Sequence, residues 1–338
     1  MDSRKYYWID NLKAFGIFLV VVGHSGVPGI LGKLIYGFHM PLFFVISGYL
    51  FNQEKWFGKG FWCFLKNRWK SYIKLYFLWA GINLVLNFPI EMLENSYTIH
   101  EGLQSTVNHI RWILISYGGS KDYPNCTPLW FLPCLFIASL YLFWLLYLKW
   151  RKGTIIALLI SILMLLQNYF VGMNQNIILP WHIDVALSAS VFMLFGYLIK
   201  ETSVLSKHIS LALLTLFSLI GIVAVMLNGK IDMNMNELAV HPLFYLGASM
   251  LSFVLMFMFF NSRRLNIKYN VISKIGGGKN TITILGLNYL LNKLFVIIFG
   301  DIMPDQVKWI ADTIFVMIIC YLVICANEKI KQSKLLVK

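Results

Sequence analysis

The side chains best suited to acid–base chemistry in this sequence are two histidines, His24 and His39, on either side of a short loop. Each lies in an apolar segment, where a titratable group is costly and is therefore a functional candidate by default. If the two segments form an antiparallel helical hairpin centred between residues 31 and 32, both histidines lie at the same depth. Since an imidazole exchanges a proton near neutral pH, the pair predicts a reaction centre with one histidine as general base. The alternative is a structural pair that hydrogen-bonds neighbouring helices.

Two charged residues share the first segment with His24. Lys13 precedes His24 by 11 residues, which is about three helical turns, so both side chains project from one face about 16.5 Å apart along the axis. Asp10 lies three residues before Lys13 and can reach it across one turn. In the second segment, Pro41 removes an amide donor and frees a carbonyl one turn earlier, which predicts a polar notch close to His39.

The composition indicates where these residues lie. The 338 residues are 58% hydrophobic and only 13% charged, whereas a soluble globular protein carries about 25% charged residues. This excludes a water-soluble enzyme, a disordered chain and a disulfide-rich secreted domain. The five cysteines show no ligand spacing, so neither a disulfide framework nor a metal site is expected.

We predict an all-α polytopic membrane protein whose single integral-membrane domain occupies 1–338. A helix needs about 20 mostly apolar residues to cross the hydrocarbon core. Ten segments qualify, at 12–27, 34–51, 72–88, 129–148, 154–171, 185–199, 209–227, 243–260, 281–299 and 309–326.

The distribution of charge predicts the orientation of these helices. With ten spans, 23 of the 29 lysines and arginines fall on the side of the two termini and five on the opposite side. Cytoplasmic loops carry such an excess, so both termini are expected to be cytoplasmic. The net charge of +14 is then a topological signal, and no nucleic-acid partner is expected. The longest outer connection, 89–128, contains an apolar run at 110–115 and is expected to include an interfacial helix in contact with membrane lipids.

The motifs around the two histidines resemble those of the membrane acyltransferase-3 family, whose members O-acylate bacterial cell-surface carbohydrates. The matching runs in the first two predicted helices are WIDNLK at 8–13, the spacing of Lys13 to His24, and FHMPLFFVISGYL at 38–50. Weaker matches are LWFL at 129–132, Asp184 ahead of FGY at 195–197, and GKNT at 278–281. The chain departs from many members at Asn288, where they carry a histidine, and at Leu75, where they carry a proline.

The resemblance implies an acyl donor of the acetyl-CoA type, which is cytoplasmic and polyanionic. Cationic side chains at the inner end of the helices are suited to its phosphates through charge-assisted hydrogen bonds. The candidates for this donor site are Lys13, Arg68, Lys70 and Lys74. Asp10 and Ser47 are expected to support the site.

The acceptor implied by the resemblance is a hydroxyl of a cell-surface glycan or of its lipid-linked precursor, in the cytoplasmic membrane of a bacterium. His24 is expected to act as the general base and His39 to orient it or to stabilise the oxyanion, with an acyl-histidine intermediate as the competing mechanism. Candidates for acceptor binding are Asp184, Trp130 and His182. Asp184 is equally suited to cap a helix, and Trp130 to an interfacial belt. The alternative function is a transporter or flippase of a lipid-linked saccharide or polysaccharide.

Overall fold

The computed structural model describes residues 7–116, 128–172, 179–265, 271–300 and 302–336, and in these residues the regular structure is helical. One isolated bridge between Asp232 and Glu237 is the exception. Helices satisfy every backbone donor and acceptor within one segment, which hydrocarbon demands of a chain this apolar. The all-α prediction is confirmed.

Each of the ten predicted spans coincides with a helix in the described part of the chain. Seven helical stretches there are long and apolar enough to cross a membrane and two further apolar helices are shorter, whereas the first helix, Tyr7–His24, falls in neither group. The ten helices are α1 Tyr7–His24, α2 Gly29–Tyr49, α5 Lys74–Glu94, α7 Phe131–Lys152, α8 Thr154–Gly172, α9 Ile183–Glu201, α10 Leu211–Leu227, α11 His241–Asn261, α13 Asn280–Phe299 and α14 Asp305–Leu336. The chain is a polytopic membrane protein.

Short helices connect these elements. They are α3 Gln53–Lys59, α4 Phe61–Arg68, the π-helical turn η1 Trp69–Ile73, α6 Ile99–Ile115, η3 Pro180–His182, η4 Val204–Ser206, η5 Arg263–Leu265 and α12 Val271–Gly276. The helix α6 occupies the middle of the connection 89–128, and its first turn carries a capping box formed by Thr98 and Glu101. Its position at the membrane interface stays a prediction.

Two prolines lie inside helices. The helix α2 continues through Pro41, and α5 continues through Pro89 to Glu94, beyond the predicted end of that span at residue 88. A proline removes one backbone donor but leaves the rest of the helical ladder intact, so packing can carry a helix past it.

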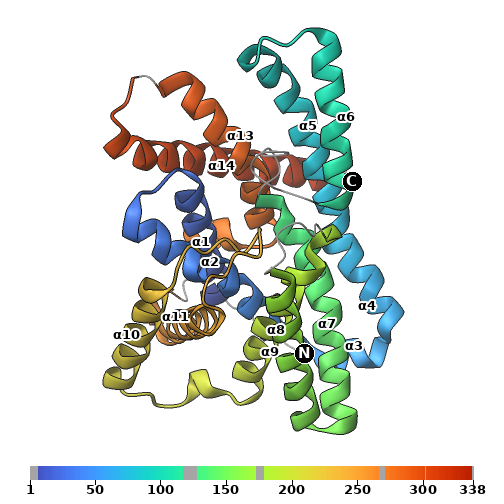
Figure 1. The fold of residues 1–338 in the computed structure, drawn as a ribbon, viewed down its shortest axis with the longest axis vertical. Coiled ribbons are helices and arrows are strands. Elements are labelled where there is room, and N and C mark those ends of the chain that lie inside the picture. The colour runs from blue at the N-terminus through green and yellow to red at the C-terminus, as the bar shows by residue number, and fades with distance from the viewer. Residues whose placement is uncertain (1–6, 117–127, 173–178, 266–270, 301, 337–338) are drawn as a thin grey trace.

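The helices α1 and α2 form the centre of the bundle (Figure 1). The helix α2 packs on α9 and α11, and α1 packs on α12 and α13. The helices α7 and α8 flank α9, whereas α5 and α6 form an antiparallel pair at one end of the molecule (Figure 1). The two histidine-bearing helices are therefore held from both sides by later parts of the chain.

Glycines permit close backbone contacts in this centre. A Cβ atom on Gly48 would overlap the carbonyl oxygen of Met193 in α9, and one on Gly196 would overlap the carbonyl oxygen of Val45 in α2. Small residues let membrane helices approach until their backbones touch. The two Gly-Tyr motifs singled out in the sequence thus face each other across the α2–α9 contact.

Candidate active site

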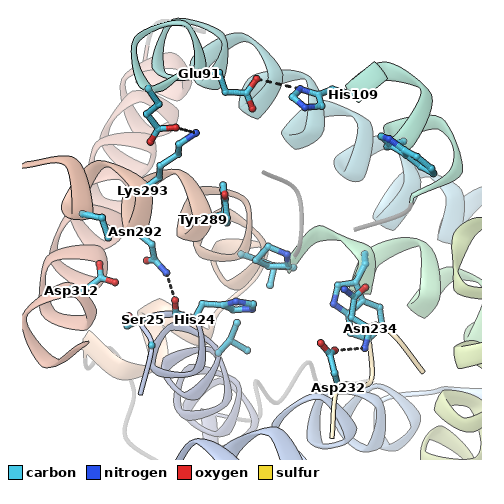
Figure 2. Close-up of a pocket in the computed structure, with 18 of the residues that line it drawn as sticks. His24, Ser25, Glu91, His109, Asp232, Asn234, Tyr289, Asn292, Lys293 and Asp312 are labelled. Atoms are coloured by element: carbon cyan, nitrogen blue, oxygen red, sulfur yellow. Dashed lines mark hydrogen bonds and ion pairs between the residues drawn. The ribbon is translucent and has the colours of Figure 1, made fainter. Parts of the chain in front are cut away.

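His24 and His39 line one cavity of about 1230 Å³. Figure 2 shows this cavity with His24 in its wall. Its walls come from α1, α2, α5, α6, α13, α14, the start of α7 and the connection between α10 and α11. Most of these contributions lie towards the helix ends that the charge distribution predicts to be extracytoplasmic, called here the outer side. Since ligand pockets in proteins usually measure about 300–1,000 Å³, the cavity has room for an extended ligand.

The backbone of His24 is held by a helix from the far end of the chain. His24 is the last residue of α1, and the Nδ2 atom of Asn292 in α13 donates to its carbonyl oxygen at 2.9 Å (Figure 2). The imidazole is partly accessible, and it faces the cavity. A fixed backbone beside an open cavity holds the ring of His24 where a ligand can reach it.

His39 is nearly inaccessible, and one of its ring nitrogens is already engaged. Its Nδ1 atom lies 2.7 Å from the carbonyl oxygen of Ile35. Because a carbonyl only accepts, Nδ1 carries the proton, and Nε2 of a neutral ring is left as an acceptor. The ring also packs edge-on against Tyr36 at a centroid distance of 5.3 Å.

Charged side chains at the rim of the cavity are paired. Lys293 of α13 contacts Glu94 of α5 at 2.7 Å and donates to Asn87 at 3.2 Å. Close by, Nδ1 of His109 lies 3.7 Å from a carboxylate oxygen of Glu91 (Figure 2). The pair with Glu94 removes the cost of an isolated lysine in the predicted span 281–299, and it ties α5 to α13 across the cavity.

Breaking this rim pair is expected to lower stability. Lys293→Gln leaves Glu94, whose side chain is 36% exposed, without its cation and should reduce the free energy of unfolding by about 0.5–1 kcal/mol. The double variant with Glu94→Gln should recover part of that loss, as measured by thermal unfolding of purified protein in detergent. Lys308→Gln is the control, because its partner Asp305 is 97% exposed. Strictly additive losses would contradict the coupling.

The cations predicted to bind the donor lie apart from the cavity lining. Lys13 forms an ion pair with Asp10 at 3.0 Å. Arg68 lies over the rings of Trp56, Phe64 and Tyr72 at centroid distances of 5.0–5.7 Å. The side chains of Lys70 and Lys74 are exposed, and Ser47 donates to the carbonyl oxygen of Phe43 at 2.8 Å. Among the described contacts, none joins Lys13 to Arg68, and a donor site shared by the four cations stays a prediction.

The three residues predicted to bind the acceptor take different places. Trp130 lines the cavity, and His182 lies behind it, with a ring-centroid distance of 5.1 Å and a contact of 2.8 Å to the carbonyl oxygen of Ser116. Asp184 does not line the cavity. Its carboxylate accepts from the amide of Val185 and from the side chain of Asn236. The capping alternative is wrong, because His182 is the N-cap residue of α9 and Asp184 lies inside its first turn.

Several cavity residues were not predicted from the sequence. They are Ser25, Asp232, Asn234, Tyr289, Asn292 and Asp312 (Figure 2). Asp312 lies inside the predicted span 309–326, so the rule that marks titratable residues in spans could have found it. Asp232 comes from a connection, where a carboxylate is ordinary and gives no signal.

The carboxyl group of Asp232 predicts a pH dependence of stability. Burial raises its pKa. A carboxyl group with a raised pKa in the folded chain stabilises the fold at low pH, and this contribution is lost as the pH rises through the folded pKa. Asp232→Asn is therefore expected to flatten the decline in unfolding free energy above about pH 4. Thermal unfolding in detergent across pH measures this, and an unchanged decline contradicts it.

Comparison with known proteins identifies the family. Residues 6–326 match a family model described as an acyltransferase domain. The chain belongs to the acyltransferase-3 family. The resemblance to this family that the motifs indicated is thus confirmed over nearly the whole chain. No curated protein and no solved structure matches it. Within the described residues, no group of three or more histidine, cysteine and carboxylate side chains could hold a metal ion.

Proposed function

We propose that this membrane acyltransferase moves an acyl group, acetyl in the simplest case, from acyl-CoA to a hydroxyl of a cell-surface glycan or of its lipid-linked precursor. The observation that carries the proposal is the position of His24. Its ring lines a large outer cavity, while Lys13 lies about three turns towards the cytoplasm on the same helix. A donor held at the inner end and an acceptor held in the cavity would then meet at His24.

His24 is the proposed general base. It takes the proton of the acceptor hydroxyl as that oxygen attacks the thioester carbonyl, and the carbon–sulfur bond then breaks. The proton returns from His24 to the departing CoA sulfur, so the enzyme ends unchanged. His39 orients this arrangement. With its Nδ1 proton directed at Ile35, a neutral His39 has no second N–H for an oxyanion.

The donor and acceptor assignments rest on chemistry. Lys13, Arg68, Lys70 and Lys74 are proposed to bind the phosphates of CoA, with Asp10 orienting Lys13 through their ion pair. On the outer side, the ring of Trp130 in the cavity wall offers an apolar face to a sugar. The membrane concerned is proposed to be the cytoplasmic membrane of a bacterium.

Transfer of label tests the proposal directly. Membranes that contain the protein are incubated with CoA carrying a labelled acetyl group and with a soluble glycoside. We expect labelled ester on the glycoside, in amounts that exceed those from membranes without the protein. A transporter or flippase would move a saccharide across the membrane without labelling it, so transport without ester formation would overturn the proposal.

A further inference from the structure

A carboxylate of α14 lies buried in the wall of the cavity beside His24. Asp312 is 4% exposed, it lines the cavity, and it belongs to a stretch apolar enough to cross the membrane. A carboxylate in such a place is expensive unless it is paired or functional. Among the described residues, no lysine, arginine or histidine forms an ion pair with Asp312.

The hydrogen bonding of Asp312 is incomplete. Among the described residues, its side-chain partner is the hydroxyl of Ser25, which also lies 2.9 Å from the carbonyl oxygen of Val21. A hydroxyl has a single proton, so it serves one of these acceptors at a time. The Oδ1 atom of Asp312 is buried and has no partner in the described structure.

Asn292 presents a second acceptor of the same kind. Its amide nitrogen donates to the carbonyl oxygen of His24, which fixes the orientation of the amide group. The remaining atom, Oδ1, is buried and has no partner in the described structure. Asn292, Asp312, Ser25 and His24 lie together on one side of the cavity (Figure 2).

Among the described residues, the cavity wall carries more carboxylates than cations. Of the described residues that line it, four are carboxylates, Glu91, Glu94, Asp232 and Asp312, and two are cations, Lys293 and Arg111. One of the cations, Lys293, is already paired with Glu94. An anionic group placed beside Asp312 would meet a like charge where little water screens it.

We propose that Asp312 and Asn292 form an acceptor subsite that binds two neighbouring hydroxyl groups of an uncharged sugar and rejects sugars that carry a carboxylate there. The two free oxygens accept hydrogen bonds from these hydroxyls and so orient the ring with its reacting hydroxyl towards His24. This inference rests on the proposed function and names the class of acceptor.

Matched pairs of simple glycosides test the subsite. The probes are the methyl glycosides of glucose, galactose and mannose and of the corresponding uronic acids, with labelled acetyl-CoA as donor. For the wild-type protein we expect kcat/KM to be at least about tenfold higher for the neutral member of a pair, the scale of one charge-assisted hydrogen bond. Transfer to none of the six glycosides would contradict the proposed function itself.

Asp312→Asn removes the charge and keeps the shape. We expect the KM for the neutral glycoside to rise about tenfold, the KM for acetyl-CoA to stay unchanged, and the discrimination against the uronic acid to fall below about threefold. Asp305→Asn is the matched control, because it makes the same change on the same helix at a side chain that is 97% exposed. A structural role would instead lower kcat/KM for the neutral and for the acidic glycoside to the same extent, and the discrimination between them would not change.

Two results would overturn the subsite. The first is unaltered discrimination in Asp312→Asn while the wild-type protein transfers acetyl groups normally. The second is loss of folded protein in both Asp312→Asn and the smaller Asp312→Ser, judged by thermal unfolding, which would make Asp312 a packing residue.

Discussion

Replacing His24 by alanine is expected to lower acyl transfer by about 10²–10⁴-fold, the usual contribution of a positioned general base. The protein should still accumulate in membranes, because the contact that Asn292 makes is with the backbone of His24 and does not need the imidazole. Initial rates of label transfer at saturating acetyl-CoA, normalised to the amount of protein in the membrane, measure the effect.

His208→Ala is the control for this experiment, since His208 is exposed and does not line the cavity. It should transfer acetyl groups at the wild-type rate. Transfer by His24→Ala within about threefold of wild type would remove His24 as the base. If an acyl-histidine forms instead, the wild-type protein should retain label after rapid denaturation in the absence of acceptor, whereas a general base leaves the chain unlabelled.

Replacing Gly48 by alanine is expected to destabilise the protein by about 3 kcal/mol, the upper part of the range for overpacking. The added methyl group would overlap the carbonyl oxygen of Met193, which belongs to the backbone and cannot rotate away. The helices α2 and α9 must therefore separate. Thermal unfolding in detergent and the yield of folded protein measure this loss.

The matched control is Gly81→Ala in α5. A Cβ atom there meets nothing within 4 Å, so the substitution should leave stability unchanged or raise it through better helix propensity. Equal effects at Gly48 and Gly81 would show that the backbone contact between α2 and α9 does not limit stability.

The helices could be predicted from the sequence because the hydrocarbon core of a membrane excludes structures that leave backbone donors and acceptors unsatisfied. Each apolar run of about 20 residues must satisfy its own backbone hydrogen bonds, so hydropathy located most of the ten helices, and seven in the described residues are long and apolar enough to span a membrane. Helix ends are less constrained. The continuation of α5 through Pro89 to Glu94 depends on packing against neighbours that no local pattern records.

The site could be predicted only in part. The spacing within one hairpin placed His24 and His39 at similar depth, and the structure puts both on one cavity. The opposite wall comes from α13 and α14, and no local spacing relates residues so far apart. The partners of Lys293 and Asp312 could therefore not be predicted from the sequence. That these two titratable residues are costly within a membrane span was predictable. The spacing of residues along the chain likewise does not predict whether Arg68 binds a donor.

The hydrogen bond from Asn292 to His24 joins residues 268 positions apart. Membrane helices enter the bilayer in order as the chain is synthesised, so the first-helix motif is in place long before its partner exists. A chain that stops after α11 would contain His24, Lys13 and His39 but lack the wall that holds the end of α1. The cavity around His24 is therefore completed last, during insertion of α13 and α14. Until then the proposed site of acyl transfer lacks one of its walls.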